Sequence, residues 1–320
     1  MIDMSFSMNK LAVNIVKDLI DHEKEYKVTT VKINGATVID TGLKVPGGIN
    51  AGLAVSKITM GGLASVNLVA YQIDTVPAVS VFTDYPVEAC MLSQLAGWRV
   101  QVKDFFANGS GPARALAKKP RKMYEAYGYN ETSDEAVLVL ETDKYPVDDA
   151  IDYIAKETNV KRESIYLVLV SPASMAGSIQ VSARIVETGL YKLDTLKFDL
   201  RSIISGFGIS PIAALHKDPL IMAGKTNDML LYGGITHYVV DVDNDDVIKS
   251  IIDRVPSSSS KDYGKSFTDL AMQYGWDFLY KVDPSIFAPA IITMNNIKSG
   301  KSYVSGRINK EILRKALGFS

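Results

Sequence analysis

The chain has 320 residues, 47% of them hydrophobic and 22% charged, with a formal net charge of −1, so neither nucleic acid nor a membrane surface is expected as a partner. A single cysteine, Cys90, excludes an internal disulfide and favours a cytoplasmic location, and the N-terminus has no signal-peptide pattern. Three scattered histidines lack metal-ligand spacing, so no metal site is expected.

The N-terminal part of the chain mixes helix and strand patterns. Apolar residues at helical spacing predict a first amphipathic helix over residues 8–20, and alternating segments around Asn34 and Gly35 predict a β-hairpin. Further strands are expected over residues 65–73, 78–82 and 98–102, with helices near 50–57 and 86–95. A loosely placed boundary near residue 130 divides the chain into two α/β domains, residues 1–130 and 131–320.

A glycine-rich segment before a predicted helix start is the first candidate binding site. Gly109, Ser110 and Gly111 precede Pro112, and Arg114 lies in the first helical turn. Free backbone N–H groups at a helix start, together with a guanidinium, suit a phosphate or carboxylate group. An ordinary loop leading into a capped helix is the alternative.

The C-terminal part alternates strands and helices. Strands are expected over residues 136–140 and 165–170, with a helix over 147–156 between them, so the chain is predicted to be α/β, with α+β character as the alternative. Residues 206–213 are expected to form a loop, and residues 224–234 a loop with a strand. A strand over 235–242, a helix ending near residue 254, a helix reaching residue 274, a hairpin within 287–305 and a helix over 308–316 complete the pattern.

The helix expected after residue 174 carries the candidate catalytic pair. Ser174 is a plausible N-cap, and Gln180, Arg184, Glu187 and Tyr191 follow at offsets of four, three and four, which places them on one helical face. In a cleft, Arg184 would hold Glu187 ionised, and Glu187 could then accept and return protons. A solvated surface ion pair is the alternative.

Several familiar motifs are incomplete. Gly-Lys-Ser or Gly-Lys-Thr occurs three times, but a P-loop also needs a glycine five residues earlier, where this chain has Pro219, Ser259 and Asn295. There is no Gly-x-Ser-x-Gly elbow. These absences argue against a nucleotide-dependent phosphotransferase and against a serine hydrolase.

The order and spacing of several segments are distinctive: residues 34–38, 61–64, 107–116, 171–175, 184–187, 226–229, 231–234, 263–265 and 287–290. Through them, and over nearly its whole length, the sequence resembles the archaeal-type methenyltetrahydromethanopterin cyclohydrolase family. Members of that family interconvert a cyclic methenyl-pterin cation and the ring-opened N5-formyl pterin in one-carbon metabolism and methanogenesis. Ser182-Ala183 departs from the Ser-Gly expected before the arginine.

The resemblance implies two α/β domains with a substrate cleft between them, a homotrimer, and catalysis without metal or nucleotide cofactor. It places the catalytic arginine and glutamate at Arg184 and Glu187. A non-catalytic protein that binds a pterin or a phosphorylated small molecule is the alternative function. The residues expected to bind substrate are Gly109, Ser110, Gly111, Arg114, Ser174, Gln180, Thr226, Asn227, Asp228, Tyr232 and Lys265.

Overall fold

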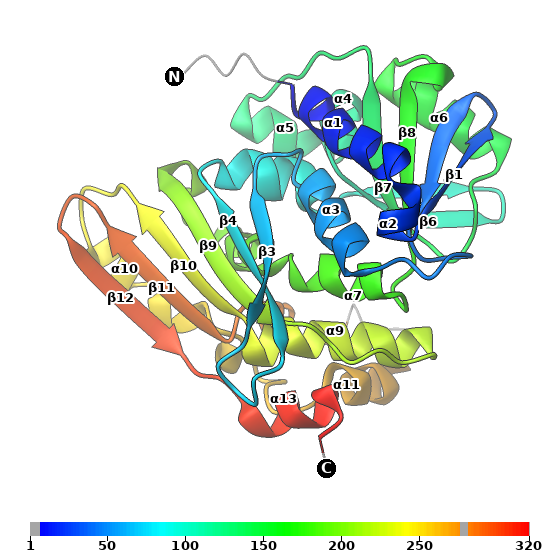
Figure 1. The fold of residues 1–320 in the computed structure, drawn as a ribbon. Coiled ribbons are helices and arrows are strands. Elements are labelled where there is room, and N and C mark those ends of the chain that lie inside the picture. The colour runs from blue at the N-terminus through cyan, green and yellow to red at the C-terminus, as the bar shows by residue number, and fades with distance from the viewer. Residues whose placement is uncertain (1–6, 276–280, 320) are drawn as a thin grey trace. The chain divides into compact units, whose positions relative to one another are not determined.

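The computed structural model describes residues 7–275 and 281–319. The chain forms two compact units, one made of Met1–Ala64 and Glu88–Gly177 and the other of Ser65–Val87 and Ser178–Ser320. Each unit therefore consists of two segments, whereas the sequence pattern predicts a single boundary near residue 130. Each unit contains one six-stranded sheet covered by helices, which confirms an α/β fold with two sheets (Figure 1).

The first unit is built on a mixed sheet with the strand order β1-β2-β8-β7-β6-β5. Its central strands β2, β8 and β7 run parallel to one another, and the other neighbouring strands pair in antiparallel fashion. The strands are β1 (Thr29–Ile33), β2 (Ala36–Asp40), β5 (Trp98–Val102), β6 (Phe105–Ser110), β7 (Ala136–Glu141) and β8 (Ile165–Val170).

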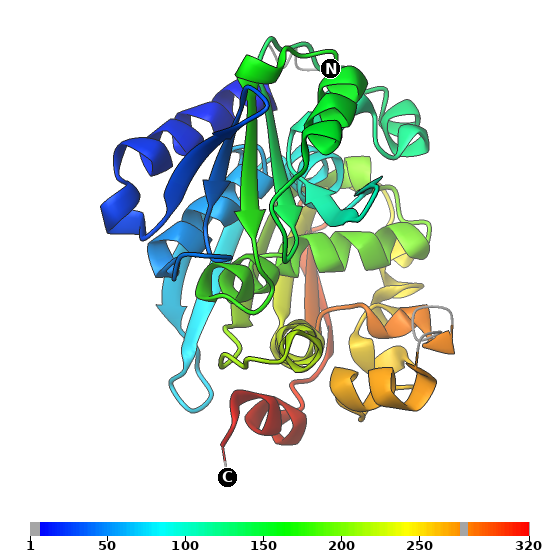
Figure 2. The ribbon, with the colours of Figure 1, turned by 90° about the vertical axis from the view of Figure 1, so that its right-hand side faces the viewer.

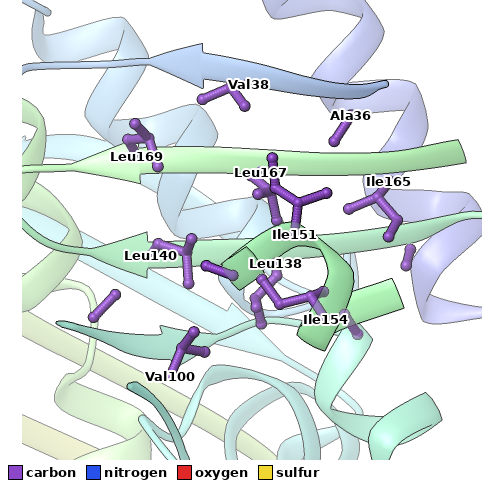
Figure 3. Packing of buried hydrophobic residues seen from close by; sticks show 14 of the residues in the cluster. Ala36, Val38, Val100, Leu138, Leu140, Ile151, Ile154, Ile165, Leu167 and Leu169 are labelled. Carbon is purple, nitrogen blue, oxygen red and sulfur yellow. The ribbon is translucent and has the colours of Figure 1, made fainter. Parts of the chain in front are cut away.

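Both faces of this sheet are covered, which explains the uninterrupted apolar runs of β7 and β8. Side chains of α1 and α3 pack with Val137, Val139 and Val168 on one face. On the other face, Ile151 and Ile154 of α6 lie over Leu138 and its neighbours (Figures 2 and 3). The helices are α1 (Met8–Asp21), α2 (Glu23–Tyr26), α3 (Ile49–Thr59), η1 (Val87–Gln94), α4 (Ala113–Ala117), α5 (Arg121–Tyr127), α6 (Asp148–Thr158) and η2 (Arg162–Ser164).

The second unit is built on a sheet with the strand order β12-β11-β10-β9-β4-β3. Strands β10 and β11 run parallel, and the other pairs are antiparallel. Strands β3 and β4 come from the early segment of the chain, and β4 pairs with β9 far along the sequence. The strands are β3 (Ser65–Ala70), β4 (Pro77–Thr83), β9 (Ile203–Pro211), β10 (Ile235–Val240), β11 (Ile291–Asn296) and β12 (Lys301–Gly306).

Helix α7 begins in the first unit and ends in the second, and α8 and α9 then pack against the second sheet. Helices α11 and α13 pack against α9. The helices are α7 (Met175–Ser182), α8 (Ile185–Thr195), η3 (Leu200–Ser202), α9 (Pro219–Gly233), α10 (Asp246–Lys249), η4 (Ile252–Arg254), η5 (Ser257–Ser259), α11 (Phe267–Tyr274), η7 (Pro284–Ile286) and α13 (Lys310–Leu317).

The strongest local signals are confirmed. The first helix covers Met8–Asp21, and its Ser7 N-cap accepts a hydrogen bond from the Lys10 N–H. The Asn34-Gly35 hairpin joins β1 to β2, and both turn residues have positive φ angles, 45° and 87°, as such a turn requires. The closing hairpin is formed by β11 and β12.

The sequence prediction is wrong for two segments in which glycines were interpreted as loop residues. Residues expected as a loop at 206–213 form most of strand β9, and residues expected as a loop with a strand at 224–234 lie mainly in helix α9. In both elements the glycines permit close packing rather than a turn. A Cβ on Gly208 would lie 2.7 Å from Ile185 Cγ2, and one on Gly224 would lie 1.9 Å from Thr268 Oγ1.

Candidate active site

Ser174 caps the helix that leads to the candidate catalytic pair. Its hydroxyl accepts a hydrogen bond from the Gly177 N–H at 3.0 Å and donates one to the Ser171 carbonyl at 2.8 Å, so the predicted N-cap is confirmed. Gly177 must lack a side chain, because a Cβ there would lie 2.0 Å from the Ser171 oxygen. The helix therefore starts at a fixed point, at Met175, after the short segment that follows the end of β8 at Val170.

The helix is not continuous. α7 ends at Ser182 and α8 begins at Ile185, whereas the apolar spacing predicted one helix through this region. The Arg184 N–H bonds to the Val181 carbonyl, three residues back instead of four, which tightens the turn before α8. Arg184 is thus the residue immediately before α8, and Glu187 lies in the first turn of that helix.

Gln180, Arg184 and Glu187 converge despite the break. Arg184 Nε donates to Gln180 Oε1 at 3.3 Å, and Arg184 Nη1 lies 3.7 Å from Glu187 Oε2. The side chains of Arg184 and Glu187 are 13% and 10% exposed, so the two charges are largely removed from water. The alternative of a solvated surface pair is therefore wrong, and the charges interact more strongly than they would in bulk water.

Close packing fixes this segment against the second sheet. The hydroxyls of Ser178 and Ser182 donate to the carbonyls of Ala213 and Pro211, at 3.1 and 2.8 Å. The Tyr238 hydroxyl on β10 donates to the Val186 carbonyl at 2.7 Å. The side chains of Arg184 and Glu187 therefore project from a rigid support, which is what a positioned catalytic group needs.

Helix α8 approaches β10 closely enough to require a glycine. A Cβ on Gly189 would lie 2.1 Å from the Tyr238 hydroxyl oxygen. Sequence reasoning missed the positioning roles of Gly189, Tyr238, Ser178 and Ser182, because their partners lie far along the chain. The small residues between 172 and 183 were the one signal of a tightly packed helix.

Lys192 is another residue that the sequence did not single out. It lies on α8, is buried, and donates from Nζ to the Ser285 carbonyl at 3.3 Å. Burial lowers the pKa of this amine. In the sequence, Lys192 is distinguished only by lying about two helical turns after Arg184. That spacing is equally typical of a surface lysine, so it does not indicate burial.

The predicted pterin-binding residues of α9 divide into two groups. Thr226 and Asn227 donate to backbone carbonyls of their own helix, at Ala223 among others. Asp228 is buried, and its carboxyl group accepts a hydrogen bond from the Phe267 N–H at 2.8 Å. Burial raises the pKa of Asp228 from 3.8 to about 7.

Tyr232 lies one turn after Asp228 and is bonded to the turn before α11. Its hydroxyl donates to the Lys265 carbonyl and accepts from the Gly264 N–H. Lys265 Nζ donates to Gln273 Oε1 at 2.9 Å on an exposed surface. Asp228, Tyr232 and Lys265, predicted separately from the sequence, therefore belong to one connected group around residues 264–267.

The Gly109–Arg114 segment differs from its prediction. Gly109 and Ser110 are the last residues of β6, not a loop, and α4 after them is only five residues long. Arg114 is wholly buried and donates to the carbonyls of Met91, Ser93 and Lys119. Anion binding at this segment stays a prediction. The guanidinium of Arg114 is buried and already bonded to backbone carbonyls, so it is not an exposed ligand for an anion.

Within residues 7–275 and 281–319, no group of three or more His, Cys, Asp and Glu side chains is arranged to hold a metal ion. Among the helices of these same residues, none has the length and apolarity needed to cross a membrane.

Comparison with known proteins gives a consistent result. A family model described as Cyclohydrolase (MCH) matches residues 7–317. A methenyltetrahydromethanopterin cyclohydrolase of Methanocaldococcus jannaschii is 45% identical over 98% of this chain and 99% of its own. Enzymes with the same name from Methanococcoides burtonii and Methanothermobacter marburgensis are each 42% identical, over 98% of this chain and 98% and 99% of theirs.

Proposed function

The chain belongs to the cyclohydrolase (MCH) family, and we propose that it interconverts 5,10-methenyltetrahydromethanopterin and N5-formyltetrahydromethanopterin, with Glu187 as the acid–base group. The largely buried Arg184–Glu187 pair is the observation that carries this assignment of roles. The proposed setting is archaeal one-carbon metabolism of the methanogenic type, in the cytoplasm, with a homotrimer as the working form.

The chemistry needs a proton acceptor and little else. The methenyl carbon lies between two nitrogens that share a positive charge, so it is an electrophile that water can attack. Glu187 takes the proton of the attacking water as the C–O bond forms, which leaves a neutral carbinolamine. When the bond from that carbon to one ring nitrogen breaks, Glu187 returns the proton to the departing nitrogen. The carbinolamine hydroxyl loses its own proton to water as its oxygen becomes the formyl carbonyl, so the formyl group stays on N5 and one proton is released overall.

Arg184 and Gln180 position the carboxylate. The guanidinium bonds to Gln180 on one side and lies beside Glu187 on the other, so the carboxylate is held in one orientation beside a positive charge. The cationic substrate carries its own electron sink, and the proposal therefore includes neither a metal ion nor a redox or nucleotide cofactor.

The α9 group supplies a proposed contact to the pterin ring. A carboxyl group with a pKa of about 7 can donate or accept a hydrogen bond at neutral pH, and Asp228 is such a group. The edge of a pterin offers donors and acceptors side by side. Thr226, Asn227, Tyr232 and Lys265 extend the same proposed contact, and Ser174 marks the start of the catalytic segment.

The experiment that tests the function follows the ultraviolet absorbance of methenyltetrahydromethanopterin mixed with purified protein. Opening of the ring removes the conjugated methenyl chromophore, so a catalysed loss of absorbance is expected, with no change after prior treatment with a chelator. Binding without any loss of absorbance would favour the non-catalytic alternative. Activity abolished by the chelator and restored by zinc would overturn the proposed chemistry.

A further inference from the structure

The first unit contains a pocket that the proposed reaction does not use. It lies where α4 packs against α6, beside α5, and has a volume of about 660 Å³. Sites for small organic molecules typically have volumes of about 300–1,000 Å³, so the size fits such a ligand. Its lining comes from side chains between Leu116 and Asn130 and from Glu157, and we call it the α4–α6 pocket.

The α4–α6 pocket and the catalytic segment belong to opposite edges of the first sheet. Helix α6 connects the end of β7 to the start of β8, and these two strands run parallel. The last turn of α6, which carries Glu157, therefore lies at the edge where β8 begins, whereas Ser174 follows the end of β8. All the residues proposed to bind or convert the pterin lie outside the lining of the pocket.

Positive charge is concentrated beside this pocket. Four cations, at positions 118, 119, 121 and 122, fall within five consecutive residues, although the net charge of the chain is −1. Lys118, Lys119 and Arg121 line the pocket. The wholly buried guanidinium of Arg114 lies 6.0 Å from the ring centroid of Tyr124, another lining residue, and adds positive charge nearby. A concave surface with an excess of one charge concentrates ligands of the opposite charge.

The two carboxylates that line the pocket are each paired with one of these cations. Glu157 lies 2.6 Å from the Lys119 amine, and their side chains are 27% and 35% exposed. Glu125 lies 2.7 Å from the Arg121 guanidinium, but there the side chains are 56% and 81% exposed. An ion pair so open to water contributes about 1 kcal/mol or less, so the Arg121 guanidinium can turn to a bound anion at little cost.

Lys118 supplies a cation that is not neutralised by its partner. Its Nζ donates to the side-chain oxygen of Asn130 at 2.8 Å, and this amide is uncharged. Within the described part of the chain, no Asp or Glu lies at ion-pair distance from Lys118. Lys118 and Arg121 can therefore hold one doubly charged group together. The planar guanidinium of an arginine suits the paired oxygens of a phosphate or a carboxylate.

An apolar wall completes the pocket. Leu116 and Ala117 are partly buried and pack against the core of the first unit. Tyr124 and Tyr129 also line the pocket, and the hydroxyl groups of both donate hydrogen bonds to other parts of the protein. Their rings are thereby fixed and offer apolar surface, which is the usual composition of a site for a small organic molecule.

We infer that the α4–α6 pocket binds a small organic anion, in which an apolar or planar body carries a phosphate monoester or two carboxylates. The body lies on the apolar wall, and Lys118 and Arg121 hold the charged part. A nucleic-acid strand fits less well, because Glu125 and Glu157 would repel its successive phosphates. The inference does not depend on the cyclohydrolase reaction, and the absorbance assay of the pterin measures a different site, so either proposal can fail alone.

The test measures binding to the full chain by titration calorimetry at constant ionic strength, with four probes. AMP carries a phosphate monoester on a planar body, and phthalate carries two carboxylates on an aromatic ring. Inorganic phosphate supplies the charge without the body, and adenosine the body without the charge. We expect AMP, phthalate or both to bind at one site per chain, at least about tenfold more tightly than inorganic phosphate or adenosine. Binding of only AMP would identify a phosphate ligand, and binding of only phthalate a dicarboxylate.

A pair of double variants locates the binding. Lys118→Gln with Arg121→Gln should raise the dissociation constant of the tighter probe about tenfold or more, because hydrogen bonds to charged groups are lost. The matched control is Lys161→Gln with Arg162→Gln. It removes the same two charges from exposed residues of the same unit outside the pocket, and Arg162 also pairs with a carboxylate. The control should bind the probe as the wild type does.

Ala117→Trp tests the shape of the pocket without changing its charge. The indole ring would occupy part of the apolar wall, so binding of the tighter probe should weaken about tenfold or more, with circular dichroism as the check that the variant is folded. No saturable binding of AMP or phthalate below about 10 mM would overturn the inference. Equal losses in the two double variants would also overturn it, as would inorganic phosphate that binds as tightly as AMP and phthalate, or a single-stranded oligonucleotide that displaces them.

Discussion

Asp228 is a buried carboxyl group whose ionisation opposes folding. Its raised pKa, about 7 against 3.8, arises first from burial, and the nearby Asp269 adds to it while Lys315 opposes it. The native state therefore holds this proton more tightly than the unfolded chain does. Its stabilising contribution is complete below pH 4 and is lost as the pH rises through 7.

Asp228→Asn should remove this pH dependence while keeping an oxygen that can accept the Phe267 N–H. Compared with wild type, the variant should gain stability steadily between pH 4 and pH 7, by a few kcal/mol at most. Urea unfolding at several pH values measures the difference. Asp199→Asn is the control with the opposite sign, because its hydrogen bond with Arg201 lowers the pKa of Asp199. A stability difference between the wild type and the Asp228→Asn variant that does not change with pH would contradict the argument.

Arg114 is a structural residue by its contacts. Arg114→Ala would leave the carbonyls of Met91, Ser93 and Lys119 without this donor, and each unsatisfied buried group costs about 1–3 kcal/mol. We expect a clear fall in melting temperature. Any loss of substrate binding should be equal for the phosphorylated pterin and for a truncated pterin without phosphate. A selective loss for the phosphorylated form would restore Arg114 as an anion ligand.

At the scale of elements, the position of α8 depends on glycines at its contact with the second sheet, and one of them, Gly189, lies on α8 itself. Gly189→Ala would place a methyl group against the Tyr238 hydroxyl, and overpacking of this kind costs about 1–3 kcal/mol. Because Glu187 lies on the same helix, turnover should fall together with stability.

A double-mutant cycle measures the interaction between Gly189 and Tyr238. Tyr238→Phe removes the hydroxyl that the new methyl group would meet, and loses its hydrogen bond to Val186. The double variant should therefore be more stable than the sum of the two single losses predicts. Strict additivity of the two free-energy changes would mean that the methyl group added at position 189 does not contact the Tyr238 hydroxyl.

The distance along the chain between contacting residues explains which elements the sequence predicted well. The Asn34-Gly35 turn and the Ser174 cap rest on bonds within a few residues, so their signals are local. For the segments that contain Gly208 and Gly224, the prediction was wrong. Each of these glycines lacks a side chain because a residue far along the chain packs against it, Ile185 against Gly208 and Thr268 against Gly224. Nothing in the local sequence distinguishes such a glycine from one in a turn.

At the scale of the whole molecule, the alternation of strands and helices predicted the α/β class but not how the segments combine. β4 joins β9 across more than a hundred residues, and no local pattern records that pairing. The helical spacing did bring Gln180, Arg184 and Glu187 together, because offsets of three and four tolerate the break before α8. Arg114 could not be judged in the same way, since its partners Met91 and Ser93 lie in a segment more than twenty residues earlier.

The central claim is that Glu187 moves the proton, and Glu187→Gln tests it most directly. The change keeps the shape of the side chain but removes the proton acceptor, so substrate should still bind while turnover falls about 100- to 10,000-fold. Glu125→Gln is the matched control, because Glu125 also pairs with an arginine, Arg121, but on the exposed surface. That control should keep wild-type turnover. If Glu187→Gln keeps more than about a tenth of wild-type turnover, below the usual range for acid–base catalysis, the base is another group.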